Sequence, residues 1–238
     1  MLGYTSERLD PLLIPAKAAS DRARLDLHVE RYRLAAEYVR EAHVVDCACG
    51  TGFGSAALIQ AGARSVDGVD LDREALEFAR SRHALPGITF FEADALRFVP
   101  SLVPSVWVSV DTMERLPNPV AYVNHVAQLL PQGGRFIVSV PVTVTTDSDQ
   151  HHLHDFTRES FRALLRAHGF KEERMLEQRR RFTFVDLLSR SPGLRPREHR
   201  QGLLAFYARR PRVLGQRVAR TFTKGFVHEY LTVVAVKS

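Results

Sequence analysis

The feature that most constrains the fold is a glycine loop that follows a short apolar run, in the stretch VVDCACGTGFGSAALIQAGARSVDGVDL. Gly50, Gly52 and Gly54 are spaced two apart, and Asp70 follows Gly50 by about twenty residues. Glycine permits a tight turn and lets a ligand approach the backbone without a Cβ in the way. A helix that opens after such a loop offers free N–H groups and a positive dipole end to a phosphate or carboxylate. The pattern predicts a nucleoside-containing ligand, with the carboxylate of Asp70 on two ribose hydroxyls.

Strand and helix patterns alternate along the rest of the chain. We expect strands over 43–49, 65–71, 88–96, 105–113, 135–142, 172–178 and 229–238. We expect helices over 20–41, 53–63, 72–85, 118–130 and 157–170. This alternation is typical of an α/β fold, in which right-handed crossovers connect the strands of a parallel sheet.

The composition fits one α/β domain over residues 1–238, because 45% of the residues are hydrophobic and 25% are charged. Within it we expect an N-terminal helical cap (1–42), a cofactor-binding core (43–182), a basic helical segment (183–227) and a last strand (228–238). No apolar run is long enough to cross a membrane, and the first residues do not form a signal peptide pattern. Cys47 and Cys49 both lie in the glycine motif, which favours reduced thiols and a cytoplasmic location.

The glycine spacing separates two classes of nucleotide cofactor. A dinucleotide motif reads G-x-G-x-x-G/A, but here the sixth position is Ser55. The spacing G-x-G-x-G after VVD resembles the first motif of class I S-adenosylmethionine-dependent methyltransferases. Four later stretches are similar to further motifs of that family: GVDLDREALEFAR, ITFFEADAL, VSVDTMERLPNPVAYVNHVAQLLPQGGRFIVSVP and HHLHDFTRESFRALLRAHGF. The resemblance covers about 28–182 and the last strand. It implies a Rossmann-like sheet of seven strands, mostly parallel with an antiparallel last strand, with helices on both faces and S-adenosyl-L-methionine as cofactor.

The resemblance also implies roles for individual residues. Asp46, Gly50 and Gly52 would line the methionine and ribose of the cofactor, and Asp70 would hold the ribose hydroxyls. The adenine would lie against Leu71, with Asp94 and Ala95 at its edge, and Val110 and Asp111 would lie near the methionine. Arg31 and Tyr32 would belong to a helix that closes over the cofactor and reaches its carboxylate, although helix packing is an equally good role for Tyr32.

The catalytic residues do not carry over from the family in the same way. The family often has IEHL after the fourth strand, where this chain has MERL, so that Arg115 stands in place of a histidine. A hydroxyl acceptor needs a base, and histidine titrates in the useful range. The candidates are His151, His152 and His154, which follow the fifth strand. A structural role for these histidines, and a metal site completed by Asp147, Asp149 or Asp155, remain alternatives at this point.

The favoured function is transfer of a methyl group to a small-molecule or glycan acceptor at a hydroxyl oxygen, and methylation of nitrogen or carbon remains an alternative. A nicotinamide-dependent oxidoreductase and a non-catalytic scaffold are the alternatives. Between Thr183 and Phe226 the chain has ten basic and two acidic residues, so this segment carries +8 and the remainder −2 of the net +6. It is expected to be a lid over an anionic or carrier-linked acceptor, a contact with an anionic membrane, or a solvated cap. Nucleic acid is a less favoured partner, because no RNA-binding motif accompanies the arginines.

Overall fold

The computed structural model describes residues 10–13, 19–142, 152–182 and 226–238, together with the single residues 208, 211 and 215. His151 and nearly all of the basic segment lie outside these residues, so the expectations for them stay predictions, as does the division of the chain into parts. Among the helices that are described, none combines the length and the apolar character needed to cross a bilayer.

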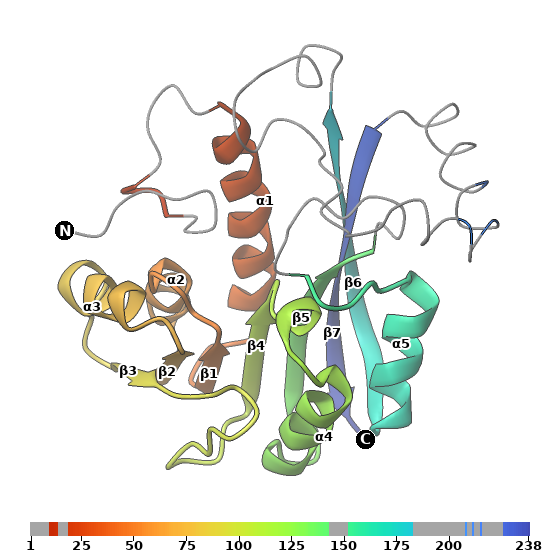
Figure 1. Cartoon of the computed structure of the whole chain (residues 1–238). Coiled ribbons are helices and arrows are strands. Elements are labelled where there is room, and N and C mark those ends of the chain that lie inside the picture. Colours follow the sequence, from red (N-terminus) through yellow and green to blue (C-terminus); the bar gives the residue numbers. More distant parts are fainter. Residues whose placement is uncertain are drawn as a thin grey trace.

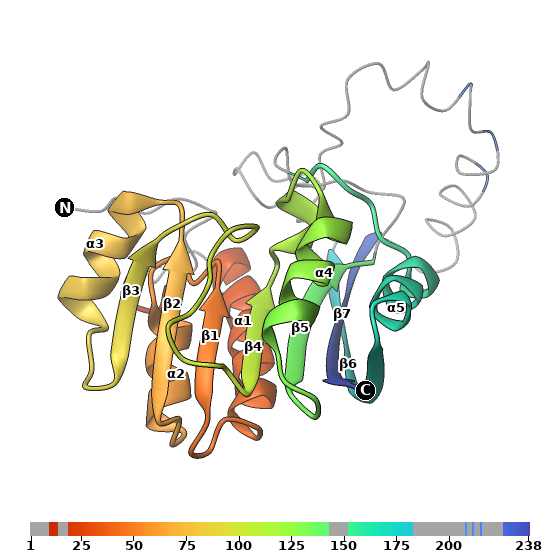
Figure 2. The ribbon, with the colours of Figure 1, turned by 90° about the horizontal axis from the view of Figure 1, so that it is seen from below.

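The centre of the molecule is one sheet (Figures 1 and 2). Its strands are β1 (His43–Cys47), β2 (Ser65–Asp70), β3 (Ile88–Glu92), β4 (Val106–Val110), β5 (Arg135–Pro141), β6 (Phe170–Phe182) and β7 (Phe226–Lys237). They lie in the order β3-β2-β1-β4-β5-β7-β6. The pairs from β3 to β5 are parallel, whereas β7 is antiparallel to both of its neighbours. The expected fold is therefore confirmed, including its antiparallel last strand.

Helices cover both faces of this sheet. They are α1 (Ala19–Ala36), α2 (Phe53–Gln60), α3 (Arg73–Arg82), α4 (Pro119–Leu129) and α5 (Arg158–Ala167), with a 3-10 helix η1 (Met113–Arg115) directly after β4. Central strands such as β4 are buried along their whole length. Val106 and Val108 pack on one face with residues of α1 and α2, and Trp107 packs on the other with residues of α4 and α5. A strand that is apolar on both faces requires this two-sided cover.

Side-chain caps set the starts of three helices. The carboxylate of Asp72 accepts from the N–H of Ala75 at the start of α3, at 3.2 Å. Asn118 caps α4 in the same way and is followed by a proline at the first helical position. Thr157 forms a capping box with Ser160 at the start of α5. Such caps satisfy N–H groups that the helix itself leaves unpaired.

Several boundaries differ from the sequence prediction. The first helix ends at Ala36 rather than 41, and the chain turns at Glu41, whose φ is 58°. The third and fourth strands also end early, where Asp94 begins a turn and Asp111 adopts a φ of 52°. These two early ends matter for function, because they release the chain at the edge where parallel α/β sheets bind ligands.

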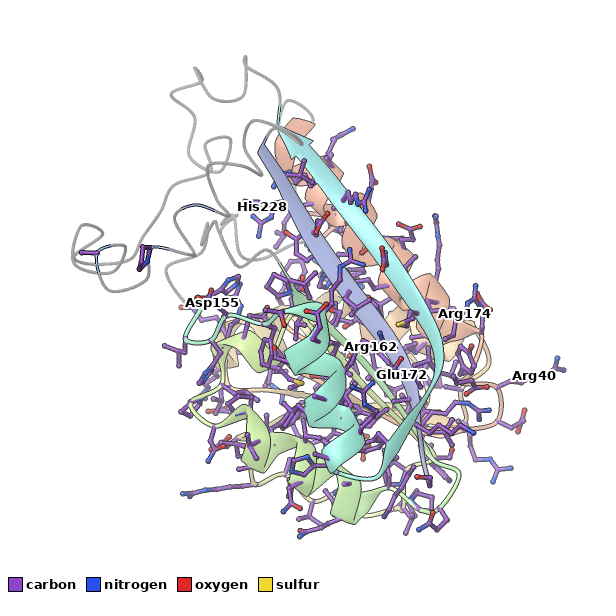
Figure 3. All side chains as sticks on the ribbon, turned by 90° about the vertical axis from the view of Figure 1, so that its right-hand side faces the viewer. Arg40, Asp155, Arg162, Glu172, Arg174 and His228 are labelled. Carbon is purple, nitrogen blue, oxygen red and sulfur yellow. The ribbon has the colours of Figure 1, made fainter. Side chains whose placement is uncertain are left out.

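The strand β6 is nearly twice as long as the predicted strand over 172–178. Figure 3 shows β6 and β7 as a long two-stranded ribbon that α1 and α5 flank. Glu172 of β6 accepts from Arg162 of α5, with Nη2 and Oε2 2.7 Å apart, and Arg174 of β6 pairs with Glu37 after α1 at 2.5 Å (Figure 3). The alternating charged side chains of β6 hide its strand character from an apolarity search.

Candidate active site

The glycine loop lies where β1 ends and α2 begins. Its first two glycines differ in what a side chain at each position would contact. Gly50 has a φ of 55°, and a Cβ there would meet no atom within 4 Å. Its N–H donates to Oδ2 of Asp70 at 2.8 Å. A Cβ on Gly52 would lie only 2.7 Å from the Cβ of Ala79 and 2.8 Å from the ring of Phe90. Gly50 therefore leaves open space beside Asp70, whereas Gly52 lets α3 and β3 pack closely.

The third glycine, Gly54, serves the packing of α1. A Cβ at this position would lie 2.1 Å from Cζ of Tyr32, closer than any real contact. The ring of Tyr32 is held in place, since its hydroxyl donates to Oδ1 of Asp46 at 2.9 Å and the side chain is only 3% exposed. The regular glycine spacing therefore combines one open position with two positions of close packing.

Asp46 is the buried centre of a small hydrogen-bonded cluster. Its second carboxylate oxygen accepts from the hydroxyl of Ser55 at 2.6 Å, so both oxygens are occupied by protein donors. Burial raises the pKa of Asp46 to about 6, although the bonds from Ser55 and Tyr32 oppose that rise. The cluster fixes α1 and α2 on β1, and the contact of Asp46 with the cofactor stays a prediction.

Asp70 ends β2 with both of its carboxylate oxygens directed at backbone donors. Oδ2 accepts from Gly50 and Oδ1 accepts from the N–H of Asp72, each at 2.8 Å. A carboxylate oxygen has a second lone pair, so each can still accept from a ribose hydroxyl. Burial raises the pKa of Asp70, and the bonds from Asp72 and Gly50 lower it. The adjacent Leu71 is 67% exposed, which leaves an apolar surface for a flat ring to cover.

Asp111 ends β4 and forms an ion pair with Arg31 of α1. Arg31 is 2% exposed; its Nη1 contacts Oδ2 of Asp111, and its Nε donates to Oε1 of Gln178 at 2.7 Å. Its guanidinium also lies 4.3 Å from the ring centroid of Tyr230. Burial alone would raise the pKa of Asp111, but the charge of Arg31 outweighs it and holds that pKa well below its usual range. The pair fastens α1 across β4, β6 and β7.

The short helix η1 carries a buried acid, Glu114. The residue is 0% exposed, and its backbone oxygen accepts from the N–H groups of Leu153 at 2.7 Å and of His154 at 3.1 Å. These bonds dock the segment after β5 on the end of β4, and they bring Nε2 of His152 to 3.8 Å from Oε1 of Glu114. Burial raises the pKa of Glu114 to about 7. Among the described residues no group of three histidine, cysteine or acidic side chains is suited to a metal ion.

Residues 44–134 match the family model of a methyltransferase domain. The order and directions of the strands are those of the class I S-adenosylmethionine-dependent methyltransferase fold. The match to a methyltransferase domain supports S-adenosylmethionine, the expected cofactor, over a nicotinamide dinucleotide. A curated relative, the fatty-acid O-methyltransferase of Mycolicibacterium smegmatis, is 27% identical over 139 residues, which is 57% of this chain. The matched region spans 50% of the length of that relative.

Solved structures show the same fold at low sequence identity. An N-methyltransferase of Bradyrhizobium japonicum, in complex with S-adenosyl-L-homocysteine, has a TM-score of 0.61 and 12% identity, covering 94% of this chain and 90% of its own. The magnesium protoporphyrin IX methyltransferase of Synechocystis, with bound S-adenosylmethionine, has a TM-score of 0.60 and 16% identity, covering 94% and 86%. Because these identities are low, the likeness supports the fold and not a shared acceptor.

The fold brings most of the expected cofactor residues to one edge of the sheet. Leu71, Asp94, Ala95, Val110 and Asp111 all lie at or just after the carboxyl ends of β2, β3 and β4. The strand order reverses between β1 and β4, and ligands of open α/β sheets bind at such a reversal. By contrast, Arg31 and Tyr32 are engaged with protein partners, so their reach to the cofactor carboxylate stays a prediction.

Sequence reasoning missed His28 and Glu114. His28 lies one helical turn before Tyr32, and its ring centroid is 5.5 Å from that of Tyr32 and 5.7 Å from that of Phe53. Its Nδ1 lies 3.6 Å from Oδ2 of Asp111, and burial lowers its pKa. The spacing of four between His28 and Tyr32 places both on one helix face, which is a signal that could have found it. Glu114 has no comparable signal, because an acid in a short polar stretch is ordinarily a surface residue.

We expect Gly54→Ala to lower the free energy of unfolding of the protein by about 2 kcal/mol, because the added methyl group would force the ring of Tyr32 from its place. Urea denaturation measures this change. Gly50→Ala is the matched control, since its methyl group enters open space and costs only the backbone strain of a positive φ, about 1 kcal/mol. Equal stability of Gly54→Ala and the wild type would contradict the packing role.

We expect Asp70→Ala to weaken S-adenosylhomocysteine binding by about tenfold to a hundredfold, because hydrogen bonds to a charged group contribute roughly 1.5–3 kcal/mol. Isothermal titration calorimetry measures the loss, and circular dichroism verifies the fold. Asp67→Ala removes the same charge from the middle of β2, away from the ligand edge, and should leave the affinity unchanged. A folded Asp70→Ala protein with wild-type affinity would rule out the ribose role.

Proposed function

We propose that this protein transfers a methyl group from S-adenosylmethionine to a hydroxyl oxygen of a small-molecule or glycan acceptor. The observation that carries the proposal is the open space at Gly50 beside Asp70, at the reversal of strand order between β1 and β4. A Cβ at Gly50 would meet nothing within 4 Å, so a ligand can lie directly on the backbone there.

The residues of this edge fit the cofactor. Asp70 offers two carboxylate lone pairs to ribose, Leu71 offers an exposed apolar side chain to adenine, and Asp94 with Ala95 lies beyond it after β3. Asp111, directly after β4, then lies near the methionine part of the cofactor. When bound, the cofactor supplies a methyl group on a sulfonium sulfur, and the neutral thioether that remains is a good leaving group. The protein has to align the acceptor oxygen with that methyl, and alignment alone can lower a barrier by several kcal/mol.

The charges near the methionine part of the cofactor site favour a neutral hydroxyl over an anionic acceptor group. Asp111 and Glu114 are both carboxyl groups near the end of β4, and Arg31 is already paired with Asp111. A hydroxyl must lose its proton during transfer, and His152 is a group of suitable basicity at this place. The fatty-acid O-methyltransferase relative also methylates oxygen, as its name states, and its acceptor class is included in the test below.

Two measurements test this function. Calorimetry should show micromolar binding of S-adenosylhomocysteine and no binding of NAD or NADP. The protein is then incubated with trideuteromethyl-labelled S-adenosylmethionine and separate pools of sugars, hydroxy fatty acids, fatty acids and amines. Mass spectrometry should find the label on a hydroxyl-bearing compound. Binding of NAD without S-adenosylhomocysteine would overturn the cofactor, and label found only on amines or carboxylates would overturn the hydroxyl acceptor.

A further inference from the structure

Glu114 is a buried acid without the partners that such a group normally has. Neither Oε1 nor Oε2 has a hydrogen-bond partner among the residues that the structure describes, and the side chain is 1% exposed. Burial of an unsatisfied polar group is costly, and more so when the group is charged. A glutamine or leucine would be less costly if the position only filled space. The retained carboxyl therefore points to a use for its proton or its charge.

The backbone around Glu114 holds His152 beside it. The carbonyl oxygen of Glu114 accepts from both Leu153 and His154, so the residue directly before that pair is fixed over η1. His152 is 17% exposed, whereas Glu114 is enclosed. The imidazole thus lies between the buried acid and the solvent-facing side. Its Nε2 is 3.8 Å from Oε1, longer than a hydrogen bond, and catalytic hydrogen bonds in unliganded enzymes are often long.

The charged groups that face Glu114 come from each element packed against it. Burial raises the pKa of Glu114 most, and Asp111 at the end of β4 raises it further. His152 from the segment after β5 and Arg115 from η1 lower it, and the net result is about 7. An ordinary histidine has a pKa of about 6.5. A carboxyl and an imidazole this close interact strongly, so their protons are lost as a coupled pair.

We propose that Glu114 is the positioning residue of His152, and that together they form the carboxyl–imidazole pair that receives the proton of the acceptor hydroxyl. This inference rests on the proposed function and names the residue that completes its base. As the acceptor oxygen forms its bond to the methyl carbon, the carbon–sulfur bond breaks and the sulfonium becomes a neutral thioether. The proton leaves the oxygen for the imidazole, and the carboxylate of Glu114 balances the new positive charge. With Nε2–H directed at Glu114, the basic lone pair of the imidazole is on Nδ1.

The test is an NMR titration of histidine-labelled protein, with the His152 signal assigned from its absence in His152→Gln. Saturating S-adenosylhomocysteine is present throughout. In Glu114→Gln the titration midpoint of His152 should fall by about one unit or more, because an imidazolium loses its neighbouring carboxylate. Glu114→Asp keeps the acid and should fall less. His125, which bonds the carbonyl of Phe98 instead, is the internal control and should not move.

A second measurement tests whether the pair of Glu114 and His152 lies at the reacting centre. S-adenosylmethionine differs from S-adenosylhomocysteine by the methyl group and the sulfonium charge, so the midpoint of His152 should be lower in its complex if the imidazole lies near the sulfur. A midpoint that Glu114→Gln leaves unchanged would overturn the pair. Equal midpoints in the two complexes would overturn its place at the methyl group. Failure of the proposed function itself is distinguishable, because it is measured by S-adenosylhomocysteine binding and by the position of the label on the acceptor, and not by the midpoint of His152.

Discussion

Replacing Arg31 with methionine should lower the free energy of unfolding by about 3 kcal/mol, because the partly buried carboxylate of Asp111 loses the positive charge beside it. The hydroxyl of Ser139 and His28, whose pKa burial lowers, do not replace that charge. This value is the lower end of what breaking a buried pair costs, since the side chain of Asp111 keeps 24% of its surface exposed. Methionine retains much of the apolar volume of the arginine stem, although it loses the guanidinium contact with the ring of Tyr230. Urea denaturation at neutral pH measures the change.

Removing the negative charge of Asp111 as well should restore much of the stability that Arg31→Met loses. The double variant Arg31→Met with Asp111→Asn leaves no unpaired charge, so we expect it to be more stable than Arg31→Met alone. Asparagine is the suitable replacement because position 111 has a φ of 52°, a conformation that asparagine tolerates better than most residues. If the double variant were instead less stable than the single one, packing of the arginine and not its charge would account for the effect.

The glycine loop and the acid at the end of β2 could be predicted because their signals are local. A buried apolar run, closely spaced glycines and an acid on the next strand lie within about thirty residues, and the glycines have conformational reasons for their positions. The boundaries of β6 could not be predicted, because its stability comes from pairing with β7 over its whole length and not from its own charge-rich sequence.

The polar contacts that shape the acceptor end lie far apart in the sequence. Arg31 is 80 residues from Asp111 and 147 from Gln178, and no pattern in either segment specifies the other. The motif placed Arg31 near the cofactor, but only the fold shows that its charge is already balanced. The partnership of Glu114 with His152 is of the same kind, because it depends on how the segment after β5 docks on η1. Sequence therefore predicts which strand ends form the site better than it predicts the protonation states there.

Glu114 also makes the stability of the protein depend on pH, and Glu114→Gln should remove that dependence. The pKa of Glu114 rises from an ordinary 4.5 to about 7 on folding, through burial first and then the charge of Asp111, against the opposing effects of His152 and Arg115. Between these two values the folded chain holds more protons than the unfolded chain, so stability falls as pH rises. Asp46, whose pKa rises to about 6, contributes a fall of the same sign in the wild type and in the variant.

The variant should therefore match the wild type near pH 4.5 and exceed it increasingly up to pH 8, where the gain reaches roughly 3 kcal/mol. Thermal and urea unfolding across this range measure the difference. Glu92→Gln, an exposed glutamate at the end of β3, is the matched control and should show no such divergence. A gain of stability together with the changed His152 titration would mean that the buried carboxyl is kept at a cost to the fold, which is expected of a group retained for proton transfer and not for packing. A variant less stable than the wild type at pH 8 would mean that Glu114 has stabilising partners when ionised, so that its burial would no longer indicate a role in proton transfer.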